Sequence, residues 1–224
     1  MIIGFWSPKG GCGVSVFAAS CAVVASRRHR VMLVDCAGDQ AKLFGLSEPE
    51  LGVRDWLAVD TGNTDSLARI AIDAAADIRL VATGTGGRVA DEHAGTRLAA
   101  ALRARHELTI IDLGRAEDAA VVALGRVLDH LVMVTRPCYL AFHRALGHPL
   151  TPLSRGVVLH DEPRALGARD LRPILGLPLL ASFEPCPAVA RSVDGGMLAF
   201  RVHESLARPV TALIEQLAVG RSAA

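Results

Sequence analysis

The chain of 224 residues has little of what marks several large protein classes. Aromatic residues make up only 4% of it against 51% hydrophobic residues, so the core must be built from Ala, Val and Leu. No apolar run approaches the roughly 18 residues that a membrane-spanning helix needs. The first residues, MIIGFW, lack the basic segment of a secretory signal. We therefore expect a cytoplasmic protein.

The chain also lacks an excess of either charge and any evident metal-ligand cluster. Its net charge is +1, from 24 Lys+Arg against 23 Asp+Glu, which gives no overall signal for binding nucleic acid or an anionic membrane. Arg27, Arg28 and Arg30 are expected at a helix end in solvent, and a DNA-facing patch is the alternative. The five cysteines include no C-x-x-C pair, and the eight histidines are scattered, which disfavours a zinc site and a disulfide framework.

What the chain does have is a regular alternation of short apolar runs and helical patterns. Strands are expected at 2–6, 31–35, 78–83, 108–112, 131–135, 157–160 and 178–183, and helices at 15–27, 54–59, 64–75, 91–105, 116–128, 138–146, 169–175 and 204–218. Continuously apolar strands separated by helices predict an α/β fold, with a mostly parallel sheet flanked by helices on both faces. We expect residues 1–224 to form a single domain, because no linker interrupts them.

A glycine-rich loop follows the first expected strand. It reads SPKGGCGVS at residues 7–15 and leads into a helix. Its glycines allow backbone N–H groups to converge on an anion, and the helix start adds its positive dipole end. Two other expected strands end in acids, Asp35 and Asp112, and parallel sheets bind ligands at these carboxyl ends. The pattern predicts phosphate binding, and a loop that binds nothing is the alternative.

This loop resembles the deviant phosphate-binding loop of the ParA/MinD superfamily of P-loop NTPases, whose usual form is KGGxGK[ST]. VMLVDCAGDQAKLFGL, residues 31–46, falls where that family has its second acidic motif, and LTIIDLG, residues 108–114, resembles its Walker B strand. LVMVTRP, GVVLH and FEPCPAVARSVDGG resemble its later strands and its adenine-side loop. The resemblance covers essentially the whole chain. It implies a ParA/MinD-like fold that binds ATP or ADP with Mg²⁺.

The resemblance also assigns roles to positions of this chain. Contacts to the nucleotide are expected from Lys9, Gly10, Gly11, Cys12, Gly13, Val14, Ser15, Val16, Asp35, Asp112 and, on the adenine side, Pro185. Ser15 and Asp112 correspond to the Mg²⁺ site, with Asp112 acting through water. Lys9 matches the signature lysine that reaches the nucleotide of the partner subunit, so the resemblance implies a homodimer.

Three positions depart from the family's pattern. Val14 replaces the lysine that contacts the β- and γ-phosphates, and Ala37 stands where the family often has the acid that orients the attacking water. Asp39 is a possible substitute for that acid. His160 stands where many members have an adenine-reading Asn, which leaves base specificity open. Because phosphoryl transfer depends on positioned charges, we expect nucleotide binding to survive these changes better than turnover.

Within the superfamily, the replaced lysine and the stretch LFGLSEPELGVRDWLAVD are similar to the CpaE/TadZ-like and septum-site-determining-like branch. Such proteins act as localisation factors for pilus, secretion or division machinery, often behind a receiver-like domain that we do not expect here. The resemblance thus implies a scaffold with protein partners and an inactive or very slow ATPase. An active partitioning ATPase and a ligand-free interaction module are the alternatives.

Overall fold

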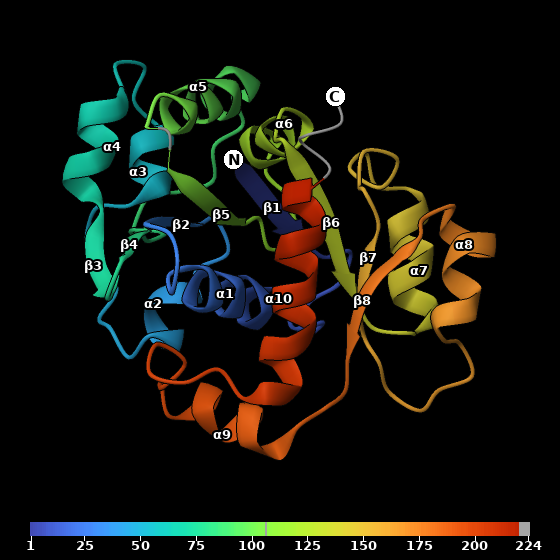
Figure 1. Ribbon diagram of the computed structural model, residues 1–224. Coiled ribbons are helices and arrows are strands. Elements are labelled where there is room, and N and C mark those ends of the chain that lie inside the picture. Colours follow the sequence, from blue (N-terminus) through green and yellow to red (C-terminus); the bar gives the residue numbers. More distant parts are fainter. Residues whose placement is uncertain (106, 220–224) are drawn as a thin grey trace.

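The computed structural model describes residues 1–105 and 107–219 and places their strands in one eight-stranded sheet, in the order β3-β4-β2-β5-β1-β6-β7-β8 (Figure 1). The strands are β1 Ile2–Trp6, β2 Val31–Asp35, β3 Ile72–Ala75, β4 Ile78–Val81, β5 Leu108–Asp112, β6 His130–Thr135, β7 Val157–His160 and β8 Leu179–Phe183. All neighbouring strands run parallel except β3 and β4. The predicted mostly parallel sheet is confirmed.

Helices cover both faces of this sheet. They are α1 Val14–Ala25, α2 Gln40–Leu43, α3 Val53–Leu57, α4 Thr64–Ile70, α5 Glu92–Arg103, α6 Ala119–Arg126, α7 Tyr139–Leu146, α8 Ala168–Leu175, α9 Pro187–Asp194 and α10 Glu204–Val219. Apolar side chains of α1, α2, α9 and α10 pack on one face, and those of α3 to α8 pack on the other. Helices α1 and α10 lie side by side (Figure 1).

Strand β1 shows why the central strands are apolar without interruption. Successive side chains of a strand point to opposite faces. Ile3 and Phe5 pack in the layer of α1 and α10, while Ile2 and Trp6 pack in the layer of α3 to α8. Each of these four side chains is at most 2% exposed. Two covered faces therefore require apolar residues at every position.

One predicted helix is wrong at its end. The helix expected at 64–75 stops at Ile70, and Ile72–Ala75 forms β3, which pairs antiparallel with β4 at the edge of the sheet. The hairpin turn between them contains Asp77 at φ 59°, a left-handed conformation that Asp tolerates better than most residues. The short helices α2 and α9 were not predicted. In the described part of the chain, no helix is both long and apolar enough to cross a membrane.

Candidate functional site

The carboxyl ends of three central strands meet at one edge of the sheet. Asp35, the last residue of β2, is the register partner of Asp112, the last residue of β5, and Asp112 also pairs in register with Phe5 of β1. The loop that follows β1 is tied to this edge, because the Ser7 backbone N–H donates to the Gly114 carbonyl at 2.8 Å. The glycine-rich loop and both acids predicted from the sequence therefore lie together.

The loop itself has the backbone of an anion-binding cradle. Gly11 and Gly13 have φ values of 76° and 88°, in the left-handed region that favours glycine. Gly13 is the N-cap of α1 and supplies no capping side chain. Within the described part of the chain, no acceptor takes up the backbone N–H groups of residues 10 to 15. These donors and the dipole of a twelve-residue helix favour a negatively charged ligand.

A cleft of about 390 Å³ opens over this cradle. Its lining includes the predicted residues Lys9, Gly10, Gly11, Gly13, Val14, Ser15, Val16 and Asp39, and also Ala37. Four other predicted residues do not line it. Three of them are buried: Cys12 is 1% exposed, and Asp35 and Asp112 are 0% exposed. The fourth, Pro185, is exposed in the segment between β8 and α9 and does not line the cleft.

The two buried acids differ in how they are held. Asp35 accepts hydrogen bonds from the backbone N–H groups of Ala37, Gly38 and Gln40, at 2.7–2.9 Å. Burial, reinforced by the negative charge of Asp112, nevertheless raises the pKa of Asp35 to about 7. Burial likewise raises the pKa of Asp112. In the described part of the chain, neither acid forms a salt bridge.

Gln40 connects the loop to these acids and had no role in the sequence prediction. Its amide Nε2 donates to Asp112 Oδ2 at 2.8 Å and to the backbone carbonyl of Ser15 at 3.0 Å. The side chain is fully buried, and its Oε1 has no hydrogen-bond partner in the described structure. The signal was present in the sequence, because Gln40 lies within residues 31–46, the stretch that resembles the second acidic motif.

Ser15 and Asp39 are in contact across the cleft floor. The Ser15 hydroxyl donates to Asp39 Oδ2 at 3.2 Å. The same hydroxyl lies close enough to Asp112 to counteract the rise in its pKa. Ala37 offers only a methyl group beside Gly114. Asp39 is therefore the carboxylate that the second motif presents to the cleft.

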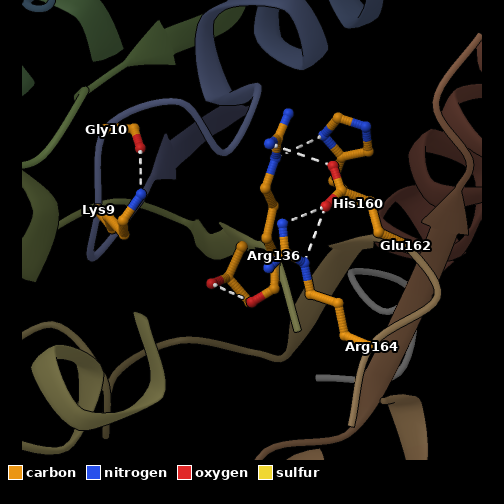
Figure 2. Close-up of polar contacts among 7 residues, drawn as sticks. Lys9, Gly10, Arg136, His160, Glu162 and Arg164 are labelled. Atoms are coloured by element: carbon orange, nitrogen blue, oxygen red, sulfur yellow. Dashed lines mark hydrogen bonds and ion pairs between the residues drawn. The ribbon is translucent and has the colours of Figure 1, made fainter. Parts of the chain in front are cut away.

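On the far side of the loop, His160 lies against Gly13. A Cβ added to Gly13 would stand 3.5 Å from His160 Nδ1, and the imidazole stacks on Phe183 with ring centroids 4.6 Å apart. Arg136 Nε donates to His160 Nδ1 at 3.3 Å, and Arg136 also pairs with Glu162 at 3.1 Å. Figure 2 shows this cluster, with Arg164 holding Glu162 from the other side. Burial, followed by the charge of Arg136, lowers the pKa of His160.

Three arginines that the sequence prediction missed also line the cleft: Arg54, Arg88 and Arg115. Arg88 pairs with Glu117 and Asp118 at 3.1 and 3.4 Å, and Arg115 pairs with Glu117 at 3.0 Å. Arg115 directly follows LTIIDLG, residues 108–114. Arg54 and Arg88 are distant in sequence from the loop and from both acidic strand ends, and no local motif marks them. Only the fold brings them to the phosphate loop.

The geometry can be compared with known proteins. No family model matches the chain. The uncharacterized protein MT3760 of Mycobacterium tuberculosis is 29% identical over 95% of this chain. The chain spans less than two thirds of the length of the curated relatives it matches, 63% in that case.

Among solved structures, a ParA family ATPase from Chlorobium tepidum superposes with a TM-score of 0.79 and 20% identity, over 95% of this chain and 97% of that one. The septum site-determining protein MinD from Pyrococcus horikoshii, in complex with Mg-ADP, superposes with a TM-score of 0.75 and 17% identity. The superposition covers 99% of this chain and 98% of that one. The chain has the ParA/MinD fold. The predicted fold class is confirmed.

The residues that line the cleft of this ParA/MinD fold suit a magnesium–phosphate ligand. Mg²⁺ prefers oxygen ligands and usually takes one or two protein groups together with phosphate oxygens and waters. The Ser15 hydroxyl lies at the first turn of α1 beside the carboxylates of Asp39 and Asp112. A cation there would offset the charge of two buried acids that no basic side chain neutralises in the described structure. Ser15 and, through water, Asp112 would hold the metal.

Proposed function

We propose that this protein binds ATP or ADP with Mg²⁺ at the loop of residues 7–15. The observation that carries the proposal is the unsatisfied cradle of backbone N–H groups, which lies over two buried acids paired in register. Phosphate groups satisfy such donors, and Mg²⁺ balances the phosphates and the acids together. Beyond Gly13, the stacked His160 and Phe183 offer a flat surface toward the adenine side.

Hydrolysis is slow in this proposal. Val14 is 9% exposed and packs in the core layer of α1, so position 14 places no charge among the phosphates. Ala37 supplies no carboxylate to orient a water. Removing one preorganised group that stabilises transition-state charge costs on the order of 10²–10³ in rate, so two such losses leave a protein that holds its nucleotide.

A second candidate is an active partitioning ATPase, and one contact favours it. Asp39 reaches Ser15 at 3.2 Å and lines the cleft, so a carboxylate is present close to the expected metal. In this alternative Asp39 takes over the role of the acid missing at position 37.

We propose that the protein acts by determining where its partners assemble in the cell. The signature lysine, Lys9, is retained at the cleft, and the one hydrogen bond of its Nζ to another described residue is to the Gly10 carbonyl at 3.3 Å (Figure 2). A lysine with so weak a local partner is available to the nucleotide of a second subunit, which supports a homodimer. We propose a CpaE/TadZ-like or septum-site-like localisation factor in the cytoplasm that recruits protein partners of pilus, secretion or division machinery. The ligand-free module remains the alternative if nucleotide is not bound.

Steady-state release of phosphate from MgATP distinguishes the two candidates. We expect wild-type turnover far below that of an ordinary partitioning ATPase, together with a rise in melting temperature on adding MgATP. Ordinary turnover that disappears in Asp39→Asn would establish the active ATPase instead. Asp60→Asn is the matched control, because the Asp60 side chain is 97% exposed and lies outside the cleft.

A further inference from the structure

The cleft holds four basic side chains, and they differ in what occupies their charge. Arg88 and Arg115 are both paired with carboxylates of the segment after β5. Lys9 contacts the carbonyl of its own neighbour. Arg54 forms no salt bridge and no side-chain hydrogen bond within the described part of the chain. Arg54 is thus the arginine of this cleft that has no partner charge within the described residues.

Arg54 is also fixed in place by its backbone. It lies in the first turn of α3, where the N–H groups of Val53 and Arg54 donate to the carbonyls of Ala82 and Thr83, at 2.8 and 3.1 Å. The approach is close enough that a Cβ on Gly52 would stand 2.3 Å from the Ala82 carbonyl oxygen. Helix α3 therefore begins directly on the end of β4.

The segment to which α3 is attached also contacts one of the buried acids. The Thr83 hydroxyl donates to the backbone carbonyl of Asp35 at 2.8 Å. Arg54 lines the cleft with Val14, Ser15 and Ala37. The charge of Arg54 also acts on the Cys36 thiol. Burial and the neighbouring acids raise the pKa of this thiol, and Arg54 lowers it. The guanidinium thus lies on the side of the cleft where the second acidic motif ends.

We propose that Arg54 is the phosphate-binding cation of this cleft and takes the place of the lysine that Val14 replaces. The proposal rests on the nucleotide binding proposed above and names the group that contacts the terminal phosphates. A guanidinium suits this task, because its planar donors bind phosphate oxygens in pairs and stay charged at any physiological pH. Val14 removes a cation from the loop, and α3 supplies one from across the cleft.

The test compares wild type with Arg54→Gln, Arg54→Lys and a matched control, Arg69→Gln. Gln keeps a hydrogen-bonding side chain but removes the charge, whereas Lys keeps the charge. Arg69 is an exposed arginine of α4 with no ion pair in the described structure, and it lies outside the cleft. Affinities for ATP, ADP and inorganic tripolyphosphate, each with Mg²⁺, are measured by titration calorimetry. Melting temperatures without ligand check that each variant folds.

We expect Arg54→Gln to weaken binding of ATP and tripolyphosphate by about tenfold or more, since charge-assisted contacts to phosphate are among the stronger hydrogen bonds. The loss for ADP should be smaller, Arg54→Lys should retain most of the affinity, and Arg69→Gln should match wild type. If folded Arg54→Gln binds ATP as wild type does, the assignment of Arg54 is wrong while the proposed function stands. If wild type binds neither ATP nor tripolyphosphate, both are wrong.

Discussion

Replacing Gln40 with Leu removes the side chain that joins the loop to the buried acids. The change deletes two hydrogen bonds, to Asp112 at 2.8 Å and to the Ser15 carbonyl at 3.0 Å. The Ser15 carbonyl keeps its helical hydrogen bond in α1, and Asp112 keeps the Gly114 backbone N–H at 3.0 Å. The main cost is therefore that of leaving the buried Asp112 Oδ2 without its amide donor, roughly 1–3 kcal/mol. Loss of the unpartnered Gln40 Oε1 offsets part of this, since an orphaned polar atom is itself unfavourable. We expect a net destabilisation of about 1–2 kcal/mol.

The pH dependence of this loss makes the prediction specific. The Gln40 hydrogen bond lowers the pKa of Asp112 against the effect of burial. Without that bond the carboxylate is harder to ionise, so the penalty should grow as the pH rises from 5 to 8, because the hydrogen bond stabilises the ionised form of Asp112.

Urea unfolding of wild type and Gln40→Leu at the two pH values measures both effects. Gln216→Leu is the matched control, because Gln216 is exposed on α10 and forms no side-chain hydrogen bond in the described structure. If Gln40→Leu unfolds at the same urea concentration as Gln216→Leu at pH 8, Gln40 does not hold Asp112 as inferred.

Three further predictions follow from the same site. The pKa of Asp35 is about 7 in the fold against an ordinary 3.8, so the folded state holds the extra proton. Without Mg²⁺, the contribution of Asp35 to the free energy of unfolding should therefore be greatest below pH 4 and fall by up to about 4 kcal/mol as the pH rises to 7. The free energy of unfolding should depend less on pH in Asp112→Asn, which removes the neighbouring charge. Val14→Lys should tighten ATP binding about tenfold and raise phosphate release, and unchanged values would show that position 14 does not face the phosphates. Ultracentrifugation should show an ATP-dependent dimer for wild type but not for Lys9→Ala, and equal masses for both with and without ATP would remove Lys9 from dimerisation.

The fold was predictable because its central strands carry a strong signal. The runs at residues 2–6 and 31–34 are apolar at every position, which is typical of a sheet covered on both faces. The edge was not predictable in the same way. In the segment 64–75 the helical pattern continues past Ile70, and tertiary pairing with β4 decides that Ile72–Ala75 is a strand.

The candidate site likewise contains residues that the sequence could place and residues that it could not. Gly11, Gly13, Asp35 and Asp112 could be placed from the sequence, because a glycine-rich turn after a strand and acids at strand ends have fixed positions in a parallel sheet. Arg54 could not, since its place depends on how α3 attaches to the end of β4.

Titration of the wild-type protein with MgATP by calorimetry tests the central claim most directly, because it requires neither turnover nor a partner. The predicted result is saturable binding of one nucleotide per chain, which falls away in Gly13→Val, where a branched side chain would occupy a φ of 88° beside His160. Absence of heat and of any melting-temperature shift at millimolar MgATP would contradict nucleotide binding and favour a ligand-free interaction module.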